Sequence, residues 1–464
     1  MIHRFSLFEK YIVLDVNSGA VLLVDEMTYD LVGRLELLET LPDTFPESMC
    51  VDLPQYSVDL LREAYGEVYS LYDEGFLFSA DDYIEERHLT ASSGAPIKAL
   101  CLHVSHDCNL RCEYCFASKG DFGTGRRQNM SPETAKRAID FVVNASGSRR
   151  NIEIDFFGGE PLLAMDTVKE AVAYAKQFAE KNFRFTITTN GLALTDEYID
   201  YINREMDNVV LSLDGRPEVN DRYRKTAGGQ GSYKHIVPKF QTFVERRKET
   251  GKDYYVRGTF TKQNLDFTED VLHLAALGFD QISVEPVVVE SVNKDTSMRD
   301  YANDAQIGID ESDLETVYRE YERLAEKMLH GVDFRFFHFN VDLSQGPCLI
   351  KRIKGCGAGT EYVAITPDGE IYPCHQFVGR EEYRMGSLDE GISAPEVRAE
   401  FEKIHALSRD ECRRCWARFY CSGGCSAANL TANGTLDIPY EIGCKLEKKR
   451  LECALVLAAI RQGG

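Results

Sequence analysis

Six apolar runs between residues 99 and 285 alternate with helical segments, and this alternation constrains the fold more than any other feature of the chain. The clearest helical segments are Pro132–Val143, Thr167–Glu180 and Tyr233–Thr250. Strands that alternate with helices form a parallel sheet with helices outside it, so the sequence predicts an α/β fold. The predicted strands are Ala99–Val104, Ile152–Phe157, Phe183–Thr189, Val209–Leu213, Tyr254–Phe260 and Ile282–Glu285.

A loop with three cysteines follows the first predicted strand. Cys108, Cys112 and Cys115 have the spacing C-x3-C-x2-C, at the carboxyl end of a strand, where ligands of parallel sheets bind. Three thiolates can hold three corners of a four-iron cluster and leave the fourth iron open for chemistry. A structural zinc site closes with a fourth ligand, so the odd number of cysteines favours a reactive cluster over structural zinc.

The cysteine loop and the motif after the second strand together resemble the radical S-adenosylmethionine (SAM) superfamily. Tyr114 and Phe116 flank the last cysteine, and Gly158-Gly159-Glu160-Pro161 closes the second strand. The resemblance implies a partial (β/α)6 barrel in which Cys108, Cys112 and Cys115 hold a [4Fe-4S] cluster. SAM binds the open iron through its amino and carboxylate groups, and its reductive cleavage gives a radical that abstracts hydrogen from the substrate.

The resemblance also implies which polar residues bind SAM. The SAM amino group is assigned to Gly158, Gly159 and Glu160, while Asn190 follows the third strand at the same rim. The ribose and carboxylate positions are assigned to further residues at later strand ends: Ser212 and Asp214 for the ribose, Arg224 and Arg257 for the carboxylate.

A second group of cysteines lies near the C-terminus and resembles the SPASM motif of peptide-modifying radical SAM enzymes. By that resemblance one [4Fe-4S] cluster is held by Cys412, Cys415, Cys421 and Cys444, and another by Cys356, Cys374 and Cys425 with Cys348. Cys348 lies outside the core motif, and without it the second auxiliary cluster has an open iron. The alternative is two structural zinc sites. Three cysteines remain as packing residues: Cys50, Cys101 and Cys453.

Residues 1–90 form a separate small domain by composition and pattern. Phe5–Val13 and Ala20–Val24 form a hairpin through Asn17-Ser18-Gly19, two helices follow, and Phe76–Phe78 is a candidate closing strand. This order resembles a winged helix, a shape also used by the RiPP recognition element that binds leader peptides. With 19 acidic and 5 basic residues, a net of −14, the domain disfavours DNA and favours a basic leader. A structural cap is the alternative.

Charge and cysteine content limit the remaining functional classes. The formal charge of −22 excludes nucleic acid as a favoured partner. The chain has no apolar run of membrane-spanning length and no signal peptide, so a cytoplasmic protein without membrane contact is expected. Fourteen cysteines in such a chain indicate metal binding or catalysis rather than disulfides.

Taken together, these features predict four parts: residues 1–90 bind a leader, 91–310 form the radical SAM partial barrel, 311–340 a bridging helix, and 341–464 the SPASM domain. Phe5-Ser6-Leu7-Phe8 and Cys356-Gly357-Ala358-Gly359 resemble the SCIFF-peptide thioether (sactipeptide or ranthipeptide) maturases. The resemblance implies three [4Fe-4S] clusters, SAM, an external electron donor such as flavodoxin or ferredoxin, and a cysteine-rich precursor peptide as substrate.

Two other functions remain open on the sequence. Anaerobic sulfatase maturases, which make formylglycine, share the cluster arrangement. They place an Asp after the cysteine that matches Cys374, where this chain has His375. A zinc-stabilised peptide-binding protein is the non-enzymatic alternative, and iron content distinguishes it from both enzymes.

Overall fold

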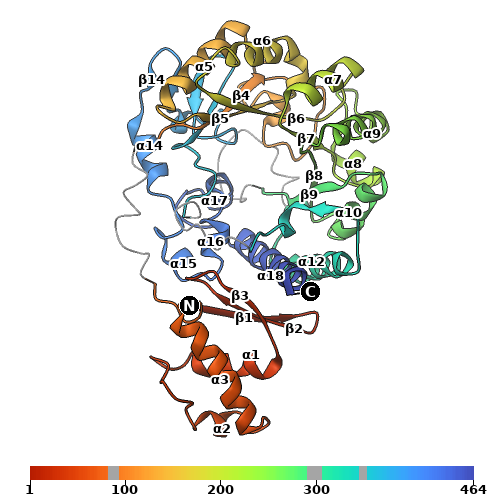
Figure 1. The fold of residues 1–464 in the computed structure, drawn as a ribbon. Coiled ribbons are helices and arrows are strands. Elements are labelled where there is room, and N and C mark those ends of the chain that lie inside the picture. The colour runs from red at the N-terminus through yellow and green to blue at the C-terminus, as the bar shows by residue number, and fades with distance from the viewer. Residues whose placement is uncertain (82–93, 290–305, 344–352, 464) are drawn as a thin grey trace.

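The centre of the molecule is a curved parallel sheet whose strands follow one another in sequence order (Figure 1). The computed structural model describes residues 1–81, 94–289, 306–343 and 353–463. All six predicted parallel strands are present, each paired in parallel with the next. They are β4 (Ala99–Ser105), β5 (Asn151–Gly158), β6 (Asn182–Thr189), β7 (Asn208–Ser212), β8 (Tyr255–Phe260) and β9 (Gln281–Pro286).

The sheet extends beyond these six strands on both edges. Short β10 (Arg335–Phe336) pairs with β9, and β11 (Tyr362–Ile365) pairs in parallel with β4. Antiparallel strands continue from there: β12 (Glu370–Tyr372), β13 (Gly386–Ser387) and β14 (Gly391–Ile392). The segment after residue 341 therefore completes the same eleven-stranded sheet instead of forming a sheet of its own.

Helices cover the outer face of the parallel strands. Strand β5 shows why, since its alternate residues Ile152, Ile154 and Phe156 are fully buried in one core that includes Ile139 and Val168 from the helices. Two helices begin at side-chain caps, Ser131 and Thr195. The helices between the strands are α5 (Pro132–Ala145), α6 (Met165–Ala175), α7 (Asp196–Glu205), α8 (Pro217–Tyr223), α9 (Tyr233–Thr250) and α10 (Phe267–Ala276).

Two long helices lie side by side below the sheet in Figure 1. The bridging helix α12 spans Leu314–Leu329, as predicted, and packs against the C-terminal helix α18 (Glu441–Gly463). Shorter helices lie between the sheet and α18: α14 (Pro395–Glu402), α15 (Asp410–Arg413), α16 (Arg418–Cys421) and α17 (Ser426–Asn433). Cys412 lies in α15 and Cys421 in α16. The segment Ser291–Ile309 is polar, which predicts a loop, and it lies mostly outside the described residues.

The N-terminal module contains the predicted hairpin through Asn17-Ser18-Gly19 and one strand more than predicted. The apolar run Phe5–Val13 is two strands, because Phe8 and Glu9 both have positive φ angles, 54° and 56°, and form a tight turn. The result is an antiparallel sheet of β1 (Ile2–Leu7), β2 (Lys10–Asp15) and β3 (Val21–Val24), followed by α1 (Glu26–Leu35), α2 (Met49–Asp52) and α3 (Val58–Asp73). The closing strand expected over Phe76–Phe78 is wrong, since these residues form turns and bends.

This small sheet is buried on both faces. Val13 packs into the core of its own helices, while Ile12 and Leu14 pack against α18 residues Leu455 and Val456. Adjacent residues of a strand point to opposite faces. A strand that is buried on both faces therefore requires a continuous apolar run without alternation. Figure 1 shows the module seated against α18 at the lower end of the molecule. None of the helices in the described ranges is long and apolar enough to cross a bilayer.

Candidate active site and cysteine groups

The three cysteines of the first loop lie together just beyond the end of β4. Their thiols are half-buried, and each affects the ionisation of its neighbours. Burial raises the pKa of Cys112 to about 12; the guanidinium of Arg224 opposes this shift and the Cys115 thiol adds to it. Burial likewise raises the pKa of Cys108, with the carboxyl of Glu160 contributing. Metal ligation requires thiolates, so this triad is suited to a cationic iron centre that offsets the cost of three negative charges.

Gly158 and Gly159 place the end of β5 directly against the backbone that leads into the cysteine loop. A Cβ on Gly158 would lie 2.2 Å from the Ser105 carbonyl oxygen, and one on Gly159 would lie 2.2 Å from that of Asp107. The amide of Gly159 donates to Ser105 O at 2.8 Å, and the amide of Glu160 to Asp107 O at 2.8 Å. The glycines were expected to admit a ligand, but the close approach in the structure is to protein backbone.

Replacing Gly159 with alanine is expected to displace the cysteine loop. The added Cβ must push back the Asp107 carbonyl, a backbone group that cannot rotate away, and overpacking of this kind costs about 3 kcal/mol. Chemical denaturation measures the loss. Gly66→Ala is the control: it lies inside α3 with nothing within 4 Å of its Cβ position, and we expect it to stabilise the chain by about 1 kcal/mol. Equal stability of Gly159→Ala and wild type would contradict this account.

Glu160 is buried, with only 1% of its surface exposed, and its carboxylate links the end of β5 to the end of β6. It accepts hydrogen bonds from Thr189 Oγ1 at 2.7 Å and from the Asn190 amide at 2.8 Å. Burial raises its pKa, and these hydrogen bonds oppose the shift. The side chain of Asn190 donates to Asn109 Oδ1 at 2.8 Å. Glu160 and Asn190 thus lie beside the cysteine loop, and the carboxylate keeps unused acceptor capacity for an ammonium group.

Asp214, Tyr114 and Arg224 form a buried network on the other side of the loop. The Tyr114 hydroxyl donates to Asp214 Oδ2 at 2.5 Å, and Arg224 Nη1 donates to the Tyr114 oxygen at 3.0 Å. Burial opposes the charge of Arg224, but Tyr114, Cys112 and Asp214 together raise its pKa. Ser212, the last residue of β7, is half-buried nearby in sequence. The sequence identifies Tyr114 only as an aromatic residue beside the three-cysteine motif.

The structure separates the two arginines that were predicted to share the SAM carboxylate. Arg257 is exposed and extends from β8 to Glu285 at 3.3 Å, and its charge acts on Asp155 and His375. Arg224 instead acts on Cys112. Arg224 therefore lies beside the cysteine loop. Arg257 interacts with Glu285, Asp155 and His375, on the inner face of the sheet, which is the face opposite the covering helices.

Four of the C-terminal cysteines come together between α15, α16 and the start of α18. Burial raises the pKa of Cys421 to about 12, with Glu447, Cys444, Cys412 and Cys415 adding to the shift. The pKa of Cys444 rises to about 11 for the same reasons of burial and neighbouring thiols. The structure thus assembles the four cysteines that were assigned to one auxiliary cluster from segments up to about thirty residues apart. Cluster binding itself remains a prediction.

A third group consists of Cys356, Cys374 and Cys425. Burial raises the pKa of Cys374, and the Cys425 and Cys356 thiols add to the effect. Cys348, the fourth predicted ligand, lies outside the described residues. Of the cysteines left as packing residues, Cys101 and Cys453 are fully buried and Cys50 is half-buried. In the described ranges, no three His, Cys, Asp or Glu side chains converge as ligands of a single metal ion would.

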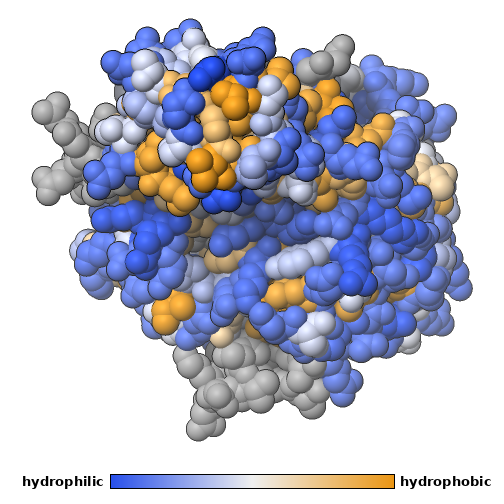
Figure 2. All heavy atoms as spheres, turned by 90° about the horizontal axis from the view of Figure 1, so that it is seen from below, coloured by the Kyte–Doolittle hydropathy of each residue, from blue (hydrophilic) through white to orange (hydrophobic). Residues whose placement is uncertain are grey.

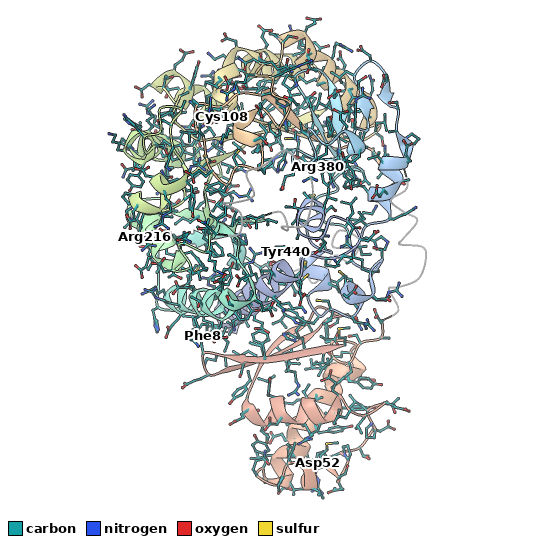
Figure 3. All side chains as sticks on the ribbon, turned by 180° about the vertical axis from the view of Figure 1, so that it is seen from behind. Phe8, Asp52, Cys108, Arg216, Arg380 and Tyr440 are labelled. Atoms are coloured by element: carbon teal, nitrogen blue, oxygen red, sulfur yellow. The ribbon has the colours of Figure 1, made fainter. Side chains whose placement is uncertain are left out.

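Figure 3 shows how the cysteine groups are distributed. Cys108 lies toward the top among the strand ends, while Tyr440, four residues before Cys444, lies lower, at the start of α18. The backbone amide of Cys444 donates to Tyr440 O at 2.9 Å. The Cys374 group lies nearer to the first loop, because the ring of His375 is 5.5 Å from that of Phe116, which follows Cys115.

Comparison with known proteins agrees with this arrangement. Residues 102–284 match the radical SAM superfamily, and residues 356–416 match the SPASM iron-sulfur cluster-binding domain. The chain therefore carries a radical SAM domain followed by a SPASM domain. Such domains bind [4Fe-4S] clusters and SAM.

Several relatives are peptide- or protein-modifying enzymes. The radical SAM cyclopropyl synthase TigE of Paramaledivibacter caminithermalis is 23% identical over 93% of this chain and 89% of its own length. A cysteine-type anaerobic sulfatase-maturating enzyme of Clostridium novyi is 25% identical over 69% of this chain and 85% of its own. Among solved structures, anSMEcpe with bound AdoMet has a TM-score of 0.62 at 18% identity, covering 79% of this chain and all of its own. Streptococcus suis SuiB bound to S-adenosylmethionine has 0.52 at 15% identity, covering 95% and 98%.

Proposed function

We propose that this protein is a radical SAM maturase that joins a cysteine sulfur to a carbon of another residue in a ribosomally made, cysteine-rich precursor peptide. The observation that carries the proposal is the assembly of three cysteine groups around one sheet, with an acidic N-terminal module packed against the segment that carries Cys415 and Cys421. A relative that aligns over 93% of the chain, N-terminal module included, is TigE, whereas the Clostridium novyi sulfatase maturase aligns over 69%. The N-terminal module favours a substrate that is bound at a separate site as well as at the active site.

Each part of the chain has a defined role in this proposal. Cys108, Cys112 and Cys115 hold the first cluster, and SAM bound there supplies the hydrogen-abstracting radical when the cluster is reduced by an external donor such as a flavodoxin or ferredoxin. Glu160 orients the ammonium of SAM, while Arg224 offsets the negative charge of the thiolates and the SAM carboxylate. The remaining strand-end residues, Gly158, Gly159, Asn190, Ser212 and Asp214, line the same site; Arg257 is reassigned to the inner face of the sheet.

The N-terminal module has features of a peptide-binding surface. Strand β3 is an edge of its sheet, and an open edge can accept an added peptide strand. Exposed apolar side chains occur on the same module, among them Leu37 and Val51, which are 76% and 80% exposed. Figure 2 shows hydrophobic groups set among hydrophilic ones on this underside of the molecule. An acidic surface with apolar contacts suits a basic leader that also carries apolar side chains.

Metal analysis tests the cofactor content. Protein prepared without oxygen is expected to contain about twelve irons with matching sulfide, because three four-iron clusters are proposed. About eight irons would mean that the Cys374 group holds no complete cluster. Zinc with little iron would instead support a zinc-stabilised binding protein and would contradict the radical mechanism.

The reaction is tested by mass spectrometry of a cysteine-rich peptide incubated with the reconstituted enzyme. A thioether product loses two hydrogens and also loses one thiol that can be alkylated. A cyclopropane product loses two hydrogens but keeps every thiol, and formylglycine formation removes the cysteine sulfur. Only the first pattern supports the proposal.

A further inference from the structure

Asp155 is a carboxylate on the inner face of the sheet that none of the assignments above uses. It lies in β5 between Ile154 and Phe156, which are buried beneath the helices, so alternation directs Asp155 to the opposite face. In register it stands beside Cys101 of β4 and Thr186 of β6. Gly158 is three residues further along the strand, about 10 Å away. Asp155 is therefore set deeper in the sheet than the strand-end site proposed for SAM.

One oxygen of Asp155 has no partner. Oδ1 is shielded from solvent and accepts no hydrogen bond from the residues that the structure describes. A buried acceptor without a donor is unfavourable, and such groups are rare in folded proteins unless they serve a ligand or a reaction. A donor supplied by a substrate would satisfy it.

The ionisable groups that face Asp155 are already engaged with other residues. They come from three strands of the same sheet: Cys101 of the adjacent β4, Tyr362 of β11 and Arg257 of β8. Tyr362 interacts with Cys101, and its hydroxyl lies 3.2 Å from Nδ1 of His375. Arg257 lies 3.3 Å from Glu285. None of these three groups donates to Oδ1, so among the described residues this acceptor position is open to a donor from a substrate.

We propose that Asp155 binds a cysteine thiol of the precursor peptide and takes its proton, which makes it a substrate-contacting catalytic residue. The inference rests on the proposed function and deepens it by naming the group that the inner face receives. In this step the S–H bond breaks, the proton moves to a carboxylate oxygen of Asp155, and the electron pair remains on sulfur. The step therefore requires no oxidant or reductant.

The acidity of the two groups favours a thiol over other donors. Burial raises the pKa of Asp155 to about 7, although Arg257 opposes the shift. A cysteine thiol has an ordinary pKa of about 8.5, close enough for efficient proton transfer. A hydroxyl is a far weaker acid, and an ammonium would bring a full charge into a site lined by the ring of Phe157, which lies 4.8 Å from that of His375.

The first test compares Asp155→Asn with Glu153→Gln in the reconstituted enzyme with SAM and a cysteine-rich peptide. Glu153 is an exposed carboxylate two residues earlier on the same strand. We expect Asp155→Asn to lower thioether formation at least about 100-fold while 5′-deoxyadenosine still forms, and Glu153→Gln to resemble wild type. The rate of thioether formation by the wild-type enzyme should rise with pH through a pKa near 7. This rise should be absent from Asp155→Asn.

A second measurement does not depend on turnover. The pKa of Asp155 is higher in the folded protein, about 7, than the ordinary value of about 3.9. Between these two values the folded state holds a proton that the unfolded state has lost, so stability falls as pH rises from about 4 to about 7 and is then constant. In holoprotein without SAM or peptide, Asp155→Asn should lose this dependence and gain melting temperature relative to wild type between pH 6 and pH 8. Parallel melting curves for the two proteins would overturn the proposal.

The outcomes separate this inference from the function on which it rests. Thioether formed by Asp155→Asn at the wild-type rate overturns the role of Asp155 alone. A wild-type product that retains all of its thiols overturns the proposed function and the role of Asp155 together.

Discussion

Replacing Cys112 with alanine is expected to abolish SAM cleavage, with 5′-deoxyadenosine formation falling at least about 1000-fold. The cluster would keep only two of its three thiolates, and a four-iron cluster so held cannot be retained with its open iron in place. Cys112 also interacts with Arg224, so its loss leaves the buried cation without a thiolate neighbour. Iron content should fall by about four per chain, which liquid chromatography of 5′-deoxyadenosine and iron analysis would measure together.

Cys453→Ala is the matched control for this variant. Cys453 is fully buried in α18 but was assigned to packing, and it belongs to none of the three cysteine groups. We expect unchanged iron content, unchanged SAM cleavage and a stability loss of about 1 kcal/mol. If Cys112→Ala retained full iron and cleavage, Cys112 would not be a cluster ligand.

Arg418→Ala is expected to lower the free energy of unfolding by about 3 kcal/mol and to reduce the iron held by the C-terminal cysteines. Arg418 is only 2% exposed, and it donates to Asn17 Oδ1 at 2.6 Å and pairs with Asp81 at 2.9 Å. Removing one member of a buried charged network leaves the others unsatisfied. Arg418 also lies between two predicted cluster ligands, Cys415 and Cys421, so its loss should disturb their spacing.

Arg414→Ala provides the comparison, because Arg414 is exposed four residues earlier on the same segment. It should change stability by less than about 0.5 kcal/mol. Denaturation curves and iron analysis of both variants test this expectation. Equal stability and equal iron content in the two variants would show that the contact with the N-terminal module is unimportant for the auxiliary site.

The same contacts change what deletion of residues 1–90 would report. Phe5 and Ile12 pack against Phe419 and Leu455, and His3 stacks on Trp416 with ring centroids 3.8 Å apart. Deletion would expose this apolar surface together with Arg418. A loss of activity in the truncated protein would therefore reflect damage to the cysteine region as well as loss of leader binding, and point variants on β3 are the cleaner test of docking.

Much of the fold could be read from local patterns. The six parallel strands and the bounds of α9 and α12 follow from apolar periodicity and from turn residues, which act over a few positions of the chain. The three cysteine groups followed from spacing and family resemblance, and the structure brings their described members together. Asp155 had a local signal that went unused, namely an acidic residue at an alternating position of a buried strand, Ile154-Asp155-Phe156.

Other features depend on which distant segments pack together, and no local sequence pattern contains that information. The turn at Phe8 and Glu9 lacks the glycine or asparagine that is typical of a tight hairpin turn. Its left-handed backbone is stabilised instead by burial of β1 and β2 on α18. Arg224 follows helix α8 and Arg257 lies in strand β8, and the fold places these two elements against different groups. The sequence by itself determined the order of strands, helices and cysteines, because these depend on side-chain type and spacing. Only the tertiary structure decided which charged groups are buried together, because burial and its cost arise when distant segments exclude water from the same space.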